Sequence, residues 1–182
     1  CIIGLEGEES IVLIREDYMD SNLSWDNYFM NMVYLVAMKS KDESTHIGAV
    51  IVGPDREIRS TGYNSFVRGA NDYLEARQER PEKYFWIEHA ERNAIYNAAR
   101  IGVSIKDCVM FTNGFPCNDC ARAIIQSGIK EVVIDTDWDS KDIWKEQQHR
   151  SDKMFEEGLV TVRKVKFNLI PSYKFCRGEF IL

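Results

Sequence analysis

Two short clusters in the sequence contain residue types that together could bind a catalytic metal ion. The first is His89-Ala90-Glu91, and the second is Cys117 and Cys120 in a Pro-Cys-x-x-Cys motif. Imidazole and thiolate are ligands that zinc prefers, and three protein ligands leave the fourth tetrahedral position open to water. The sequence therefore predicts a catalytic zinc site formed by His89, Cys117 and Cys120.

Glu91 is the predicted proton carrier of this site. Zinc lowers the pKa of a bound water from about 15.7 to near 7, and a carboxylate beside that water can accept its proton and pass it on. Residues two positions apart do not share a face of an ideal helix. The spacing alone therefore does not show that His89 and Glu91 reach the same point.

Each cluster lies at the start of a predicted helix. Residues 91–100 are alanine-rich and end before Gly102, while residues 117–127 end before Gly128, and glycine commonly terminates helices. Free backbone N–H groups and the positive end of the helix dipole favour thiolates at such a start. Cysteines three apart on a helix also lie on one face, so both can reach one ion.

The rest of the chain predicts a layered α/β fold. Ser24 is placed to cap a helix over residues 24–41, and residues 46–52 and 57–62 form a hairpin around a Gly-Pro-Asp-Arg turn. Strands that alternate with helices after an opening hairpin indicate a mixed sheet. Further strands are predicted over residues 108–112, 131–135 and 159–165, with a polar helix over residues 141–157 and a long polar loop over residues 63–88.

The two motifs together resemble the zinc-dependent cytidine and deoxycytidylate deaminase superfamily, whose His-x-Glu and Pro-Cys-x-x-Cys signature they match in full. Residues 23–30 look like the opening helix of the deoxycytidylate branch, and residues 47–52 and 60–64 look like its first hairpin. The resemblance covers residues 23–165. It departs from the branch at Ser65, where a glycine next to the nucleotide site is typical.

The resemblance implies a three-layer α/β/α cytidine-deaminase-like fold around a mixed sheet of about five strands. Residues 24–165 would form the deaminase domain, with an N-terminal extension over 1–23 and a C-terminal tail over 166–182. Zn²⁺ would be held by the histidine and the two cysteines. A zinc-activated water would attack C4 of cytosine while Glu91 carries protons to N3 and to the leaving amine. Relatives of this kind form dimers or hexamers, so we expect a homo-oligomer.

Substrate contacts are assigned to four residues near the two motifs. Asn64 corresponds to an asparagine that the superfamily uses against the sugar hydroxyl, although a turn asparagine is the plainer interpretation. Phe115 would wall the base pocket or pack in the core, and Ala90 is assigned to the same pocket. Arg68 is a candidate for the substrate phosphate, together with the other loop cations Arg77, Arg80 and Lys83, most of which a structural interpretation would leave in solvent.

Composition narrows the classes of partner. The chain has 182 residues, a net charge of −6 and five cysteines. Proteins that bind long nucleic acids usually show basic stripes, so this charge favours a free nucleotide. No apolar stretch is long enough to span a bilayer, and no secretory signal is evident. An odd cysteine count with a Cys-x-x-Cys pair favours a reducing, cytoplasmic location.

The predicted reaction is the hydrolysis of a free cytosine deoxynucleotide, with dCMP converted to dUMP and ammonia as the preferred assignment. Three alternatives remain open at this point. The substrate could be dCTP or another cytosine nucleotide. The enzyme could act on a polynucleotide, as a tRNA adenosine deaminase or a DNA/RNA cytosine deaminase, because these share the zinc motif. The chain could also be a non-catalytic zinc scaffold, in which Glu91 would be idle.

Overall fold

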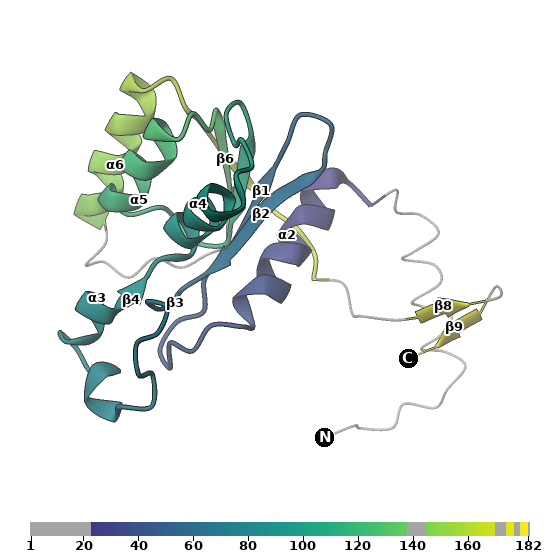
Figure 1. Ribbon diagram of the computed structural model, residues 1–182. Coiled ribbons are helices and arrows are strands. Elements are labelled where there is room, and N and C mark those ends of the chain that lie inside the picture. Colours follow the sequence, from purple (N-terminus) through teal and green to yellow (C-terminus); the bar gives the residue numbers. More distant parts are fainter. Residues whose placement is uncertain (1–22, 138–144, 170–173, 177–178, 182) are drawn as a thin grey trace.

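The computed structural model describes residues 23–137, 145–169, 174–176 and 179–181. Its centre is a five-stranded mixed sheet with the strand order β2-β1-β5-β6-β7 (Figure 1). Strand β1 is antiparallel to β2 and to β5, whereas β5, β6 and β7 run parallel to one another. The strands are β1 (Gly48–Val52), β2 (Ile58–Tyr63), β5 (Val109–Thr112), β6 (Glu131–Asp135) and β7 (Thr161–Val165).

Helices cover both faces of this sheet and complete three layers (Figure 1). On one face, α2 (Trp25–Ala37) packs through its buried apolar stripe against the sheet. On the other face lie α4 (Ala90–Ile101), α5 (Asn118–Gln126) and α6 (Lys145–Glu157). The predicted three-layer α/β/α arrangement with a mixed sheet of five strands is therefore confirmed.

Local sequence signals explain where these elements begin and end. The Ser24 hydroxyl accepts a hydrogen bond from the Asn27 backbone N–H at 3.2 Å and caps α2. Gly102 ends α4 in the left-handed region, which glycine adopts without steric cost. Strand β1 is buried along its whole length because it lies inside the sheet and is covered on both faces. Helix α2 ends at Ala37, earlier than the predicted residue 41.

Two glycines of the β1–β2 hairpin allow helices on opposite faces to approach the sheet backbone. A Cβ atom on Gly48 would lie 2.2 Å from the carbonyl oxygen of Val33 in α2. A Cβ atom on Gly62 would lie 2.3 Å from the backbone nitrogen of Ala94 in α4. Small residues on both sides of the β2–α4 contact thus place the start of α4 close to the sheet.

The predicted loop over residues 63–88 contains short ordered elements. A strand at each end pairs with the other in antiparallel register, Ser65 with Glu88 and Phe66 with Ile87. This pairing closes the segment into a lobe, defined here as residues 67–86, at one end of the domain (Figure 1). The elements are β3 (Ser65–Phe66), η1 (Glu75–Arg77), α3 (Lys83–Trp86) and β4 (Ile87–Glu88).

The predicted N-terminal extension and C-terminal tail are described only in part. The extension predicted over residues 1–23 lies, except for its last residue, outside the described residues. In the predicted tail, β8 (Lys174–Cys176) and β9 (Glu179–Ile181) form a separate antiparallel pair. Across the part of the chain that the structure describes, no helix combines the length and apolar character needed to cross a bilayer.

Candidate active site

The two metal-binding motifs meet because each places its first residue just outside a helix. His89 is the N-cap of α4, with an extended backbone at φ −76° and ψ 154°. Cys117 is the N-cap of α5, at φ −68° and ψ 172°. Cys120 lies one turn further, inside α5. Because His89 precedes the helix, the helical phase does not direct its side chain away from Glu91, and both residues line one cavity.

The three candidate ligands have a spacing that suits zinc. The Nδ1 atom of His89 lies 3.4 Å from the Sγ atom of Cys117 and 3.5 Å from the Sγ atom of Cys120. All three ligand atoms lie within 4.8 Å of one another. Zinc bonded to sulfur at about 2.3 Å and to nitrogen at about 2.1 Å, at tetrahedral angles, holds such atoms roughly 3.6 Å apart. The donor set and its geometry therefore fit one zinc ion.

Glu91 lies in the first turn of α4, and its side chain is almost completely enclosed. The residue is 4 % exposed and lines the same cavity as His89 and Cys117. Burial raises the pKa of the Glu91 carboxyl above its ordinary value. A raised pKa brings a carboxyl group nearer to the range in which it can both accept and return a proton at neutral pH.

The ligand side chains also influence one another's protonation. Hydrogen bonds from Cys120 and His89 lower the pKa of the Cys117 thiol to about 4. Burial opposes the protonation of His89, but the hydrogen bond with Cys117 and the charge of Glu91 outweigh it and raise the pKa of His89 to about 9. Metal ligands must be deprotonated, so the affinity of this set for a metal should fall at low pH.

An ion-pair network joins the starts of the two motif helices. The carboxylate of Glu88 accepts hydrogen bonds from the backbone N–H of His89 at 2.9 Å and from Nε of Arg92 at 2.6 Å. The Arg92 guanidinium also lies 3.3 Å from a carboxylate oxygen of Asp119, which stands between the two cysteines. The histidine and cysteine motifs are thus fixed to one another by side chains outside the ligand set.

Two buried asparagines hold the segment that leads into β1. Asn64 accepts from the backbone N–H of Ile47 at 2.8 Å and donates to the carbonyl of Thr45 at 2.8 Å. Asn113, directly after β5, accepts from the backbone N–H of Gly48 at 2.9 Å. Each side-chain amide thus forms a hydrogen bond that another strand would otherwise provide to this backbone segment. Asn64 lines the cavity together with Thr45 and Ile47, the two residues that it holds.

A buried ion pair ties the lobe to the segment after α2. Lys83 is 5 % exposed, and its Nζ atom lies 2.8 and 2.9 Å from the two carboxylate oxygens of Asp42. Asp42 also accepts from the backbone N–H groups of Ser44 at 2.8 Å and Thr45 at 3.2 Å. Burial alone would raise the pKa of Asp42, but the hydrogen bonds from Lys83 and Ser44 outweigh it and lower that pKa.

Three of the four predicted substrate contacts line the cavity. These are Asn64, Ala90 and Phe115. Phe115 also fulfils its structural interpretation, because its ring packs edge-on against Phe155 of α6, with a centroid separation of 6.4 Å. The side-chain bonds of Asn64 within the fold likewise match its interpretation as a structural residue.

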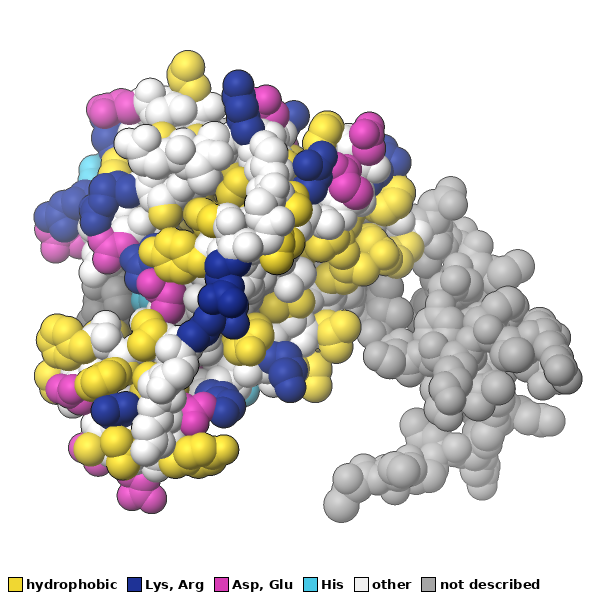
Figure 2. Space-filling model, viewed as in Figure 1, with side chains coloured by type: hydrophobic (Ala, Val, Ile, Leu, Met, Phe, Trp, Pro, Cys, Tyr) yellow, Lys and Arg dark blue, Asp and Glu magenta, His cyan; other side chains and the backbone are white. Residues whose placement is uncertain are grey.

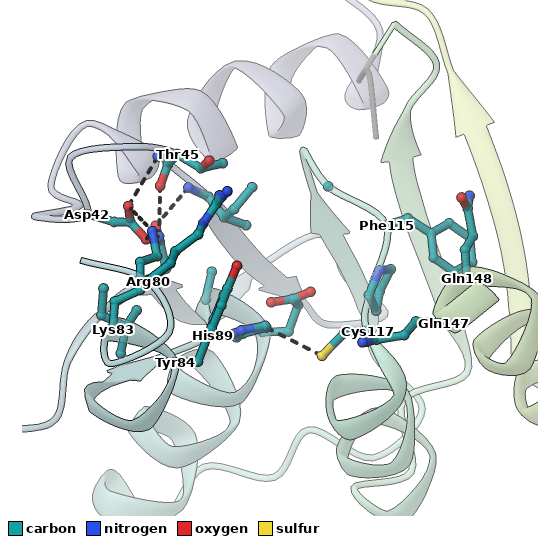
Figure 3. A pocket seen from close by; sticks show the side chains of 17 residues that line it. Asp42, Thr45, Arg80, Lys83, Tyr84, His89, Phe115, Cys117, Gln147 and Gln148 are labelled. Atoms are coloured by element: carbon teal, nitrogen blue, oxygen red, sulfur yellow. Dashed lines mark hydrogen bonds and ion pairs between the residues drawn. The ribbon is translucent and has the colours of Figure 1, made fainter. Parts of the chain in front are cut away.

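The loop cations divide into two groups. Arg68, the predicted phosphate contact, is not among the residues that line the cavity, and its guanidinium donates to the side chain of Asn97. Arg77 lies outside the cavity lining as well. Arg80 and Lys83 do line it, at the end near Asp42 (Figure 3).

The cavity includes residues that the sequence analysis did not assign to the site. Asp42 and Thr45 come from the segment after α2, Tyr84 comes from α3, and Gln147 and Gln148 come from α6 (Figure 3). None of them belongs to a motif with a chemical signature. Only the tertiary arrangement brings these segments to one cavity, so no local pattern could have identified them.

A comparison with known protein families identifies the family of this chain. Residues 23–136 match the family described as the cytidine and deoxycytidylate deaminase zinc-binding region. The chain belongs to this family. The matched range contains β1, β2, both motif helices and all three residues of the candidate zinc set. Zinc is accordingly the cofactor of this domain.

Individual relatives are similar over most of the chain. The deoxycytidylate deaminase of Homo sapiens is 39 % identical over 160 residues, covering 85 % of this chain and 78 % of that protein. The deoxycytidylate deaminase of Mus musculus is 38 % identical over 155 residues, covering 82 % of each. A crystal structure of dCMP deaminase from the cyanophage S-TIM5, in complex with dCMP and dUMP, aligns with a TM-score of 0.61 at 25 % identity, covering 76 % of this chain and 94 % of that one.

Proposed function

We propose that this protein is a zinc-dependent deoxycytidylate deaminase that converts dCMP and water to dUMP and ammonia. One observation carries the proposal: a buried Glu91 shares a cavity with a histidine and two cysteines at zinc-binding distances. The names of its relatives in Homo sapiens and Mus musculus support the choice of substrate.

His89, Cys117 and Cys120 would hold the zinc ion, which when bound supplies a Lewis acid that makes a water acidic near neutral pH. Glu91 would accept one proton of that water at its carboxylate and pass it to N3 of the pyrimidine ring as the water oxygen bonds to C4. It would then accept the remaining hydroxyl proton and pass it to the amino group, so that the bond between C4 and nitrogen breaks and ammonia leaves. Phe115 and Ala90 would border the base, and the enclosed position of Glu91 keeps bulk water from competing for the proton.

The first prediction concerns the phosphate. We expect kcat/KM for dCMP to exceed that for deoxycytidine by about 100-fold or more, because a charge-assisted hydrogen bond contributes about 1.5–3 kcal/mol and a phosphate makes more than one. Ammonia release from both substrates, measured with the purified protein, tests this. Equal values for the two would contradict a nucleotide substrate, and a preference for dCTP would change the substrate but not the reaction.

A free nucleotide is preferred over a polynucleotide for electrostatic reasons. On the face shown in Figure 2, basic side chains are interspersed with acidic and apolar ones and form no stripe. The net charge of −6 points the same way. Single-stranded DNA should therefore release no ammonia under conditions in which dCMP is consumed, and deamination of the DNA would favour the polynucleotide alternative.

We also propose that the protein is a homo-oligomer in a reducing, cytoplasmic compartment. Phe85 is 78 % exposed, and apolar side chains gather over the lobe (Figure 2). Light scattering is expected to give a mass well above the 21.1 kDa of one chain, and Phe85→Glu is expected to lower it. A monomer at all concentrations would contradict assembly. The thiols of Cys108, Cys117 and Cys120 are unpaired, which suits a reducing location.

A further inference from the structure

The cavity differs in chemical character on the two sides of the metal ligands. His89 and Cys117 lie between Phe115 and Gln148 on one side and Asp42, Arg80 and Lys83 on the other (Figure 3). Arg80 and Lys83 are the arginine and the lysine of the lining. A nucleotide whose base faces the metal ligands would extend its sugar and phosphate away from them. The question is which cation would meet the phosphate.

Lys83 is already committed to the fold. Its ammonium group contacts both carboxylate oxygens of Asp42 and the hydroxyl of Ser44, so each of its three donors has a partner. Asp42 also neutralises its charge within a buried pair. Binding a phosphate would require Lys83 to leave this pair, which would leave the Asp42 carboxylate buried without its counter-ion.

The other two arginines of the lobe, Arg68 and Arg77, also form contacts within the fold. The Arg77 guanidinium lies 3.6 Å from the centroid of the Trp86 ring and donates to the carbonyl of Asn71 at 2.9 Å. Arg68 donates to Asn97, on α4, outside the cavity lining. Neither guanidinium is placed to meet a ligand in the cavity.

Arg80 differs from all three. Its side chain extends across the cavity on the side of Asp42 and Thr45 (Figure 3). Its guanidinium carbon lies 6.0 Å from the centroid of the Tyr84 ring, and among the described residues no carboxylate forms an ion pair with it. The residue is exposed at the cavity mouth. A phosphate there could keep part of its hydration while it binds.

We propose that Arg80 binds the 5′-phosphate of the substrate and thereby sets the preference for a nucleotide over a nucleoside. The planar guanidinium offers paired N–H donors that match two phosphate oxygens. This inference rests on the proposed function and adds a residue to it. Arg80 acts on binding only, because it lies on the side of Asp42 and Thr45 and not among the residues that would transfer protons (Figure 3).

The test compares two substrates across matched variants. Arg80→Gln should lower kcat/KM for dCMP by about 10–100-fold, as expected for the loss of hydrogen bonds to a charged group, and should leave deoxycytidine within about twofold of wild type. The loss should fall mainly on KM. Arg80→Lys keeps the positive charge but not the paired N–H donors, so its kcat/KM for dCMP should fall less than that of Arg80→Gln. Arg68→Gln, an arginine of the same lobe outside the cavity, should change neither substrate.

A binding measurement without turnover completes the design. Calorimetry should show weaker binding of dUMP to Arg80→Gln, with the weak binding of deoxyuridine unchanged. A wild-type protein that deaminates neither substrate would refute the proposed function itself. A normal preference for dCMP in Arg80→Gln, or an equal loss for both substrates, would overturn only the assignment of Arg80.

Discussion

Glu91→Gln is expected to lower kcat for dCMP by about 10²–10⁴-fold, the usual contribution of a positioned general acid–base group. The substitution keeps the size and shape of a side chain that is 4 % exposed in the first turn of α4. Glutamine cannot accept a proton from water or return one to the pyrimidine. Zinc content and the affinity for dUMP should stay close to those of the wild-type protein.

The size of the expected fall in kcat distinguishes a catalytic role of Glu91 from a structural one. An acid in the first turn of a helix stabilises that helix by only about 0.3–1 kcal/mol, and such a loss would lower the melting temperature slightly without abolishing turnover. Cys117→Ala is the matched comparison, because it should lose zinc together with activity whereas Glu91→Gln should lose activity alone. If Glu91→Gln kept kcat within about tenfold of wild type, the proton-transfer role would be wrong.

Lys83→Met is expected to destabilise the folded protein by about 3–5 kcal/mol, the typical result of removing one partner from a buried ion pair. Methionine keeps most of the aliphatic stem but removes the charge that compensates Asp42, which is itself 5 % exposed. The carboxylate would then stay buried with only the neutral donors of Ser44, Thr45 and Asn64. Chemical denaturation followed by circular dichroism measures the change.

Two further variants make the result specific. Lys41→Met removes a lysine from an exposed pair with Asp72 and should change stability little, because solvent screens such pairs. Adding Asp42→Asn to Lys83→Met should recover part of the loss, because no unpaired charge remains buried. A Lys83→Met protein as stable as Lys41→Met would show that the buried pair does not hold the lobe.

The same pair predicts a pH dependence. The pKa of Asp42 is lower in the folded protein than its ordinary value of about 3.9. Its contribution to stability is therefore fully present above about pH 4 and is lost as the pH falls through the lower, folded value. The stability difference between wild type and the Asp42→Asn/Lys83→Met double variant should narrow in that acidic range.

The architecture was predictable because its signals are local. The Gly-Pro-Asp-Arg turn, the cap at Ser24 and the glycines after α4 and α5 each act within a few positions of the backbone that they direct. The three metal-binding side chains were predictable for a related reason, because two short motifs contain them. The sequence did not predict that these side chains lie close together. That proximity depends on the position of His89 just before its helix and not within it.

The substrate end of the cavity could not be predicted from sequence. Lys83 and Arg80 lie three positions apart, in a segment whose sequence does not distinguish a buried basic residue from an exposed one. One is buried because Asp42, 41 positions away, meets it in the fold. The other stays exposed at the cavity mouth. A pairing across such a distance leaves no periodicity or spacing in the sequence. The sequence likewise could not show that Arg68 lies outside the cavity lining.

Because α4 approaches Gly62 closely, the β1–β2 hairpin should tolerate amino-acid substitutions less well than most of the lobe does. Any larger side chain at Gly62 would collide with the backbone of Ala90 and Ala94, and the helix that starts with the deamination residues would have to move. The lobe over residues 67–86 is joined to the domain by paired strands and side-chain contacts instead. A protein engineer seeking a new substrate should therefore vary the lobe at positions other than the buried Lys83 and leave the hairpin glycines unchanged.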